Sequence, residues 1–408
     1  MSGGNVFAVC VDVYDCFFGV DPPGPYFYYL CAMAGIYIHI PLCRSRCVYC
    51  DFYSSTFDGN RSELVDAICA ELTERRDYLR GETVKTLYFG GGTPSLLRPD
   101  ELSKIFSAVE ANYPCAFEEV TLEANPDDLS DDFLTSLKRF PINRLSIGIQ
   151  SFHDDDLTLL NRRHTAEEAK AAVRRCQSHG FTNISIDLIY GLPNQTLSAW
   201  EDNLRQAIEL DVPHISAYHL TYEEGTKIYR MLQKGEVSEV DEELSVEMFH
   251  LLRSVLQEAG IQQYEISNFA RPGCHARHNS SYWDGTPYLG AGPAAHSFDG
   301  KDRRWNISNT RRYIEAIRSG GPYYELEVLD ETSSYNDYVI TSLRTIAGMD
   351  LKLLSERFGE PYVSYCMRQA QPFIDRGMLC RTSDRLFLTE QGLFVSDAVM
   401  EEMMMVNS

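Results

Sequence analysis

The three cysteines at residues 43, 47 and 50 are the only tight cluster among the twelve cysteines of the chain, with the spacing C-x3-C-x2-C. Thiolates are ligands of iron–sulfur clusters and of zinc. Three thiolates can bind three irons of a [4Fe-4S] cluster and leave the fourth iron open to a chelating ligand. The amino and carboxylate groups of S-adenosyl-L-methionine suit that position, and a reduced cluster can then cleave its C–S bond to release a radical.

A zinc site is the alternative interpretation of these cysteines, with His39 or Asp51 as the fourth ligand. Structural zinc sites usually combine two C-x2-C pairs, whereas this run contains one. The spacing therefore favours the cluster, and a zinc-stabilised barrel without radical chemistry stays open as an alternative.

The composition limits the partners of the protein. Of its 408 residues, 44% are hydrophobic, which is typical of a globular protein with two or three packed units. The formal net charge of -22 repels phosphate backbones and anionic lipid, so we expect no nucleic-acid partner. We expect no membrane span, because no apolar run is long enough. Cysteines scattered singly are typical of buried thiols in the reducing cytoplasm, so we expect a cytoplasmic protein.

The first 34 residues differ from the rest of the chain. They are rich in aromatic residues, Pro and Gly, show no helical or strand period, and lack the basic start of a signal peptide. We therefore expect residues 1–34 to be a non-native or disordered leader. In this hypothesis translation starts at Met33, and residues 1–32 are upstream sequence read in frame.

From Gly35 the chain alternates strand-like and helical runs. Thr165 with Glu168, and Ser198 with Glu201, have the spacing of capping boxes that begin helices. The strand-like runs are 36–40, 84–89, 119–123, 144–149, 184–190 and 214–220. Six β/α units predict an α/β fold in which residues 35–220 form a partial (β/α)6 barrel.

The alternation of strand-like and helical runs ends after residue 220. Residues 221–329 contain one clear helix and a stretch rich in Gly, Asn, His and aromatic residues, so we expect a mixed α/β extension. Residues 336–359 are predicted to be helical, and 377–392 to contain a helix end and a β-hairpin. Residues 330–408 are therefore expected to form a small winged-helix-like C-terminal domain.

Each of the first five predicted strands carries or leads into residues suited to binding. The first leads into the cysteines. The next three end at the turn Gly90-Gly91-Gly92-Thr93-Pro94, at Glu123 and at Gln150, and the fifth contains Asp187. Taken one at a time, each has a structural explanation: the glycines as a tight turn, Glu123 and Gln150 as solvated strand ends, and Asp187 as a cap of the following loop. In a parallel barrel they open onto one rim, where active sites lie. Together they indicate a site in which the glycines admit the methionine end of the cofactor and Glu123 holds ribose hydroxyls.

Several motifs resemble those of the radical-SAM coproporphyrinogen dehydrogenase superfamily, from about Gly35 to the C-terminus. They are GIYIHIPLCRSRCVYCDFYS, LYFGGGTPSLL, LEANPDDL, RLSIGIQSF, LNRRH and IDLIYGLP. The resemblance implies a radical-SAM barrel in which Cys43, Cys47 and Cys50 bind the [4Fe-4S] cluster. It implies contacts of Tyr37, Gly91 and Glu123 with a first S-adenosylmethionine. It further implies a second one lined by Tyr49, Gly92, Thr93, Gln150, Arg162 and Asp187.

One departure from this pattern separates two branches of the superfamily. The dehydrogenases resemble C-x3-C-x2-C-x-C, whereas here Phe52 stands where the further cysteine would be. That form resembles the heme chaperone branch, called HemW. The resemblance implies a protein that binds heme and delivers it to apo-hemoproteins, with an electron donor for the cluster and without coproporphyrinogen dehydrogenase activity. The alternative is an oxygen-independent coproporphyrinogen III oxidase of porphyrin biosynthesis.

A second motif, CHARHNSSYW at residues 274–283, favours the chaperone branch. His278, Asn279, Tyr282 and Trp283 fit the pattern HNxxYW, which resembles the heme-binding motif of that branch. An imidazole is a good axial ligand of heme iron, and Tyr and Trp can pack on a porphyrin. We expect this heme site to be separate from the cluster. The alternative interpretation is that the motif is only a structural turn beside a buried aromatic side chain. If it does bind heme, the other candidate ligands are Cys274, His275 and His296.

Overall fold

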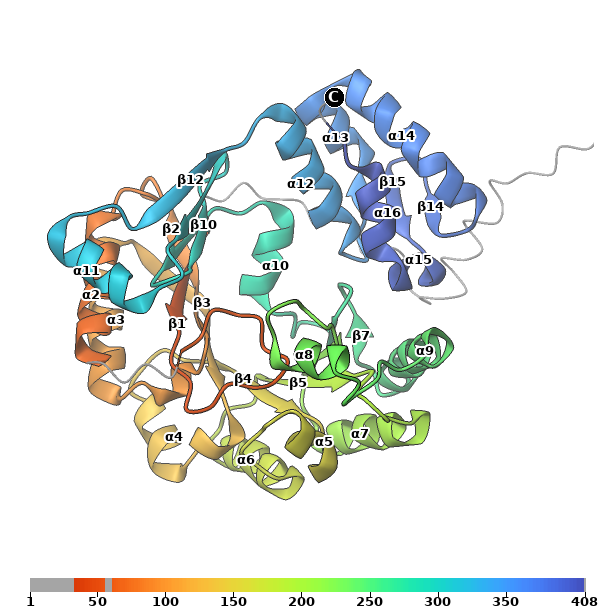
Figure 1. Cartoon of the computed structure of the whole chain (residues 1–408). Coiled ribbons are helices and arrows are strands. Elements are labelled where there is room, and N and C mark those ends of the chain that lie inside the picture. The colour runs from red at the N-terminus through yellow and green to blue at the C-terminus, as the bar shows by residue number, and fades with distance from the viewer. Residues whose placement is uncertain (1–32, 56–60, 407–408) are drawn as a thin grey trace, which may run out of the picture. The chain divides into compact units, whose positions relative to one another are not determined.

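The computed structural model describes residues 33–55 and 61–406, which form two compact units (Figure 1). The described part of the larger unit lies within residues 33–263 and 267–328, and that of the smaller within residues 264–266 and 329–406. Of the leader predicted at residues 1–34, residues 1–32 lie outside the described residues, whereas Met33 and Ala34 belong to the first described strand.

An open sheet organises the larger unit. Among the described residues it has twelve strands, in the order β12-β11-β10-β9-β1-β2-β3-β4-β5-β6-β8-β7. Its central strands are parallel: β1 (Met33–Ile40), β2 (Thr83–Gly91), β3 (Cys115–Ala124), β4 (Arg144–Gln150), β5 (Ile184–Tyr190) and β6 (His214–His219). The six strand-like runs of the sequence are thus confirmed. The sheet does not close, so the fold is the expected α/β fold with a partial barrel.

Alternation along the strands separates an apolar face from a polar one. On β1, Ile36, Ile38 and Ile40 are fully buried and share one face, and Tyr37 and His39 point to the other. Neighbouring strands add Thr86, Tyr88, Glu119, Glu123 and Asp187 to this polar face. The predicted site residues therefore share the side of the sheet opposite the isoleucines.

Helices follow the parallel strands and lie along the outside of the curved sheet (Figure 1). They are α2 (Arg61–Glu74), α3 (Pro99–Asn112), α4 (Asp131–Leu137), α5 (Asp154–Leu159), α6 (Ala166–Ser178) and α7 (Leu197–Glu209), with short 3-10 turns at Pro94–Leu96 and Pro126–Asp128. The capping box of Thr165 and Glu168 is confirmed at the start of α6. Within the described residues, no helix has both the length and the apolar character needed to cross a membrane.

The second predicted capping box is wrong. Helix α7 begins two residues earlier than the pair Ser198 and Glu201 requires, because the hydroxyl of Thr196 accepts a hydrogen bond from the backbone N–H of Ala199. Ser198 lies inside the first turn, and its hydroxyl contacts that of Thr196 at 3.1 Å. Both residue types cap helices well, so the spacing alone could not separate them.

Residues 221–328 continue the same sheet at both of its edges. Strand β9 pairs with β1, and β8 pairs with β6. The elements are α8 (Lys227–Gln233), α9 (Glu242–Glu258), β7 (Gln262–Gln263), β8 (Asn268–Ala270), α10 (Arg277–Asp284), β9 (Tyr288–Ala291), β10 (His296–Phe298), β11 (Asp302–Asn306), α11 (Thr310–Ser319) and β12 (Tyr324–Val328).

A buried carboxylate joins helix α2 to these later strands. Oε1 of Glu71 accepts hydrogen bonds from Arg75 at 3.1 Å and from Asn306 at 2.8 Å. Its Oε2 accepts from the backbone N–H of Gly292 at 2.9 Å and from the hydroxyl of Tyr313 at 2.6 Å. A fully buried charge needs such partners, so Glu71 fixes α2 against β11, α11 and the turn that follows β9.

The smaller unit packs helices against a three-stranded antiparallel sheet of order β13-β15-β14. Its elements are α12 (Glu331–Leu343), β13 (Met349–Asp350), α13 (Leu351–Phe358), α14 (Glu360–Asp375), β14 (Leu379–Arg381), β15 (Arg385–Leu388), α15 (Glu390–Phe394) and α16 (Ser396–Met403). The predicted helices at 336–359 and the hairpin within 377–392 are confirmed. Tyr335, Leu354, Leu386 and Met403 are fully buried at its core.

Candidate functional site

The cysteine loop, residues 41–55, crosses the carboxyl ends of the parallel strands (Figure 1). Its base is closed by the backbone N–H of Ser55, which donates to the carbonyl of Pro41 at 2.7 Å. Its tip is held by the carbonyl of Val48, which accepts from the N–H of Ile228 at 2.9 Å. Val48 is buried in an apolar cluster with Leu160, Ile189, Leu192, Leu220 and Ile228. The loop is therefore anchored at both ends before any metal binds.

Two of the three thiols of the loop contact polar side chains from other elements, and the thiol of Cys50 faces the carbonyl of Phe52 in the same loop. Sγ of Cys43 lies 3.6 Å from the hydroxyl of Thr93, and Sγ of Cys47 accepts a hydrogen bond of 3.2 Å from the guanidinium of Arg162. All three cysteines are free and half-buried. Burial raises the pKa of Cys43 and of Cys50 above the ordinary thiol value, so binding a metal must release their protons.

The donor set fits a cluster bound through three irons. Three thiols on one anchored loop can bind such a group, and the partly buried guanidinium of Arg162 can offset the thiolate charge. Within the described ranges, no three His, Cys, Asp or Glu side chains converge as ligands of one metal ion. His39, the alternative zinc ligand, uses both ring nitrogens, at 3.0 Å from the Tyr37 hydroxyl and 3.0 Å from the Tyr53 carbonyl. Asp51, the other alternative, is exposed.

The glycine turn after β2 packs tightly against this loop. Gly91 has φ +108°, and a Cβ there would lie 2.6 Å from the ring of His39. A Cβ on Gly92 would lie 2.7 Å from the carbonyl oxygen of Leu42. The N–H of Gly92 donates to the carbonyl of Ile40 at 2.8 Å. The glycines therefore let the end of β2 and the cysteine loop approach, which goes beyond a simple tight turn.

Glu123 ends β3 with both carboxylate oxygens turned to β2. Its Oε1 accepts from the hydroxyl of Tyr88 at 2.8 Å, and its Oε2 accepts from the N–H of Gly91 at 3.1 Å. Burial raises its pKa to about 7; the negative charge of Asp187 adds to this, and the two hydrogen bonds oppose it. Each carboxylate oxygen has a second lone pair, so Glu123 can accept further hydrogen bonds from a ligand.

Two further predicted residues lie on β4 and β5. Gln150 ends β4 with φ +76°, an uncommon backbone conformation for a residue with a side chain. Such local strain is typical of functional positions. Burial raises the pKa of Asp187 on β5 to about 6, and a hydrogen bond from Ser216 opposes this shift.

Arg162 and Asn125 form the polar centre of the site, and the second of them was missed from the sequence. The guanidinium of Arg162 donates to Oδ1 of Asn125 at 2.6 Å and to the carbonyl of Gly148. Nδ2 of Asn125 donates to the hydroxyl of Thr93 at 3.2 Å. Asn125 thus links the end of β2 to Arg162 and so to Cys47. Its place two residues after Glu123, in the motif LEANPDDL, was the available signal.

The two predicted tyrosines come from different elements, β1 and the cysteine loop. Tyr37 of β1 stacks on Tyr88 with ring centroids 5.9 Å apart, and its hydroxyl contacts Nδ1 of His39. Tyr49 of the cysteine loop packs against the apolar cluster around Val48. Burial raises the pKa of Tyr49, and the charge of Arg162 opposes this rise, which places that ring close to the guanidinium.

The HNSSYW motif lies on a helix, α10, where the sequence suggested a loop. Glu119 of β3 anchors the start of this helix: its Oε2 accepts from the N–H of Arg277 and its Oε1 from the N–H of His278, both at 2.9 Å. These are backbone donors that a helix start leaves without partners. The motif is therefore fixed to the polar side of the sheet.

The side chain of His278 is buried beside the predicted cofactor site. It is 1% exposed, and its ring stacks on Tyr88 with centroids 5.1 Å apart. Nδ1 lies 2.8 Å from the hydroxyl of Thr86, and Nε2 lies 2.9 Å from the hydroxyl of Tyr282. Burial lowers the pKa of His278 to about 3, so the imidazole is neutral, as an axial ligand must be.

The remaining residues of this region are more exposed. Asn279, Tyr282, Trp283 and Cys274 are partly buried, and His275 and His296 are exposed. His296 stacks on Trp305 with ring centroids 6.1 Å apart.

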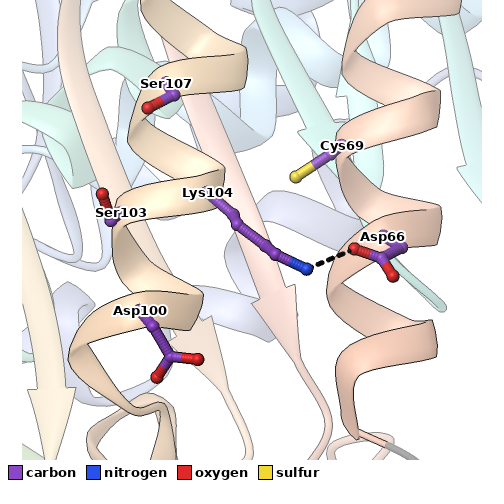
Figure 2. A pocket seen from close by; sticks show the side chains of 6 residues that line it. All are labelled: Asp66, Cys69, Asp100, Ser103, Lys104 and Ser107. Carbon is purple, nitrogen blue, oxygen red and sulfur yellow. Dashed lines mark hydrogen bonds and ion pairs between the residues drawn. The ribbon is translucent and has the colours of Figure 1, made fainter.

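A surface cleft between α2 and α3 lies apart from these residues (Figure 2). It is lined by Asp66, Cys69, Asp100, Ser103, Lys104 and Ser107, none of which was predicted as a site residue. The ammonium of Lys104 donates to Asp66 at 2.8 Å, and burial raises the pKa of Cys69 to about 11. The thiol is therefore protonated at neutral pH and unreactive.

Two families match parts of the chain. Residues 37–207 match the radical SAM superfamily, and residues 329–395 match the HemN C-terminal domain. The structure of coproporphyrinogen III oxidase (HemN) from Escherichia coli, described as a radical SAM enzyme, superimposes with a TM-score of 0.78. It covers 91% of this chain and 89% of that one at 22% identity, which shows a common fold.

Named relatives are more similar in sequence. The heme chaperone HemW of Bacillus subtilis (strain 168) is 33% identical over 371 residues, which cover 90% of this chain and 98% of that protein. The heme chaperone HemW of Synechocystis sp. (strain ATCC 27184 / PCC 6803 / Kazusa) is 39% identical over 326 residues, 77% of this chain and 78% of that protein. Similarity of this extent spans both units, and the chain belongs to the HemW family of the radical SAM superfamily.

Proposed function

We propose that the protein is a heme chaperone of the radical-SAM type, which binds heme and delivers it to apo-hemoproteins. The observation that carries this proposal is the 33% identity along 98% of the Bacillus subtilis heme chaperone. Phe52 supports it, because this exposed residue of the cysteine loop stands where the dehydrogenases are expected to have a further cysteine. We further propose that the protein works in the cytoplasm with an electron donor for its cluster.

The cofactor sites follow from the contacts of the polar side. Cys43, Cys47 and Cys50 hold a [4Fe-4S] cluster, which supplies an electron and an open coordination position when bound. Arg162 compensates the thiolate charge at Cys47 through its 3.2 Å hydrogen bond. Glu123, with a lone pair left on each oxygen, accepts from the ribose hydroxyls of a first S-adenosylmethionine.

The other predicted residues belong to this same side. Tyr37 and Gly91 complete the first cofactor site. Tyr49, Gly92, Thr93, Gln150, Arg162 and Asp187 line the space for a second S-adenosylmethionine. In this arrangement Arg162 and Asn125 position the cluster loop against the end of β2.

Heme is the cargo, and we propose that His278 supplies its axial ligand with Tyr282 and Trp283 nearby. The neutral ring has the correct protonation state. Because the ring is buried, the side chain that covers it must move before heme iron can reach it. The motif is also one aromatic ring away from Glu123, since Tyr88 contacts both residues. The heme site therefore adjoins the cofactor site and uses no cluster ligand.

A heme titration followed by visible absorbance tests the proposal. Wild type and Cys47→Ala should bind heme with similar affinity, whereas His278→Ala should show a weakened or shifted Soret band. His275→Ala is the matched control, because it removes an exposed histidine three residues away. Wild-type spectrum and affinity in His278→Ala would remove His278 from the site.

The alternative function is that of an oxygen-independent coproporphyrinogen III oxidase, an enzyme whose fold this chain shares. A turnover assay tests it. The reconstituted protein is incubated anaerobically with coproporphyrinogen III, a reductant and S-adenosylmethionine. We expect no protoporphyrinogen IX. Product at a catalytic rate would replace the chaperone by the dehydrogenase.

A further inference from the structure

His278 offers a metal only one of its two ring nitrogens. A neutral imidazole carries one N–H and one lone pair, and a metal binds at the lone pair. Nδ1 faces the neighbouring strands, where a Cβ on Gly35 of β1 would lie 3.2 Å from it and 2.9 Å from the hydroxyl of Thr86. A porphyrin has no room on that side of the ring. The iron can therefore reach His278 only at Nε2.

The hydroxyl of Tyr282 occupies that position. It lies 2.9 Å from Nε2, within hydrogen-bond distance. The Nδ1 partner, Thr86 at 2.8 Å, can accept the ring N–H, so that Nε2 keeps its lone pair and accepts the tyrosine O–H. In the opposite tautomer Nε2 carries the proton and cannot bind iron. In both tautomers the contact with Tyr282 must break before iron binds.

The surroundings of Tyr282 make it the movable member of the pair. His278 is 1% exposed and its backbone N–H is held by Glu119, whereas Tyr282 is partly exposed and lies one helical turn later. Its ring packs edge-on against Tyr288 of β9, with centroids 4.6 Å apart. The helix ends soon after, at Gly285 with φ +76°. The start of α10, which Glu119 holds, should open less readily than its last turn.

We propose that Tyr282 is a latch on the heme site: its hydroxyl and the heme iron compete for Nε2 of His278, and the closed arrangement lowers the affinity for heme. This inference rests on the proposed role of His278 as the axial ligand. It reverses the contribution expected for Tyr282 from the sequence, because loss of the hydroxyl should strengthen heme binding. The latch suits a chaperone, which must release its cargo: reclosing the hydrogen bond returns Nε2 to Tyr282 as the heme leaves.

The size of the effect follows from the population of the open state. The apparent dissociation constant equals the intrinsic one divided by the fraction of molecules that are open. Tyr282→Phe keeps the ring and removes one hydrogen bond, which also leaves a buried nitrogen unpaired in the closed state. Heme should therefore bind about fivefold more tightly to Tyr282→Phe, the factor that one net hydrogen bond represents.

The experiment is an equilibrium titration of heme and, separately, of iron-free protoporphyrin IX. Wild type is compared with Tyr282→Phe, with His278→Ala, with the double variant, and with Tyr113→Phe, which removes a buried hydroxyl bonded to the carbonyl of Leu72. We expect about fivefold tighter heme binding in Tyr282→Phe alone and an unchanged affinity for protoporphyrin IX, since only iron needs Nε2. The gain should vanish in the double variant, and Tyr113→Phe should match wild type.

The outcomes distinguish failure of the Tyr282 latch from failure of His278 as the axial ligand. Equal or weaker heme binding in Tyr282→Phe overturns the latch, as does an equal gain for protoporphyrin IX, which would mean a general loosening. Wild-type heme binding in His278→Ala instead overturns the proposed ligand. Should Tyr282→Phe fail to fold, hydrogen exchange of the wild type decides. Heme should speed amide exchange at residues 282–285 and leave residues 277 and 278 protected, and unchanged exchange at 282–285 overturns the latch.

Discussion

Tyr88 donates a hydrogen bond of 2.8 Å to Oε1 of Glu123. The same tyrosine ring stacks on His278. One side chain of β2 thus contacts both the carboxylate proposed for S-adenosylmethionine and the histidine proposed for heme. A shift of the Tyr88 ring at one site must change its packing at the other, because the ring is buried between them.

The first prediction is that the two ligands alter each other's affinity through Tyr88. Saturating S-adenosylmethionine should change the dissociation constant of heme by about fivefold, and heme should change that of S-adenosylmethionine by the same factor. Tyr88→Phe keeps the stacking and removes the bond to Glu123, so the coupling should fall. Isothermal titration of each ligand with and without the other measures it. An undiminished coupling in Tyr88→Phe would assign it to another route.

The second prediction concerns the pH dependence of S-adenosylmethionine binding. Burial raises the pKa of Glu123 to about 7, so the carboxyl is partly protonated at neutral pH and ionises as the pH rises. The ionised form is the better acceptor for ribose hydroxyls. Affinity should therefore increase between about pH 6 and pH 8 in wild type and stay flat in Glu123→Gln, which should bind about tenfold more weakly. Parallel pH profiles of the two proteins would contradict this role.

The same pKa shift has a consequence for stability. The folded state holds the Glu123 proton to higher pH than the unfolded state, because folding raises the pKa of this carboxyl from 4.5 to about 7. The contribution of Glu123 to stability is therefore lost as the pH rises through this range. Glu123→Gln should remove that loss. Thermal midpoints of the two proteins across this pH range should therefore diverge in favour of the variant.

The third prediction addresses the cluster. Cys43→Ala, Cys47→Ala and Cys50→Ala should each abolish the brown chromophore after anaerobic reconstitution, because no nearby side chain replaces the thiolate. The matched control is Cys115→Ala, since that cysteine is also half-buried and lies at the opposite end of the parallel strands. Iron and sulfide analysis measures the content. Four irons per chain in Cys50→Ala would contradict three-thiolate binding.

The fourth prediction separates backbone strain from close packing at the glycine turn. Gly180 has φ +83° with open space around its missing Cβ, whereas Gly91 has φ +108° and faces the His39 ring at 2.6 Å. Gly180→Ala should cost about 1 kcal/mol from strain alone. Gly91→Ala should cost about 2 kcal/mol more, because His39 is held by two hydrogen bonds and cannot yield freely. Thermal unfolding ranks the variants, and equal midpoints would mean that the turn is not tightly packed.

Much of this arrangement could be predicted from the sequence because its signals are local. The runs that became β1 to β6 have strand composition and are separated by helical patterns, so their carboxyl ends, and with them Glu123, Gln150 and Asp187, could be placed on one side. The cysteine spacing is likewise a local pattern. Parallel strands between helices leave few alternatives for where such residues meet.

The environment of His278 could not be predicted, because its partners are distant in the chain. Thr86 is 192 residues away and Glu119 is 159 residues away. The segment itself is short, polar and rich in Asn and Ser, a composition that favours a loop. A helix can start there because the Glu119 carboxylate accepts hydrogen bonds from its first backbone N–H groups. Asn125 was missed for a related reason: an asparagine before a proline suggests a turn, and its contacts with Thr93 and Arg162 appear only after three strands assemble.

Glu71 has a consequence for how this protein can be divided. A fragment that stopped at residue 220 would retain all six parallel strands, yet β1 would lose its partner β9 and become an exposed edge open to pairing with other chains. Glu71 would keep Arg75 and lose the donors from Gly292, Asn306 and Tyr313, so that a charge at the centre of the helix layer would face unfilled space. Residues 288–313, which follow HNSSYW, thus also cover β1 and helix α2. Residues 221–328 therefore cannot be removed without exposing β1 and depriving the Glu71 carboxylate of most of its donors.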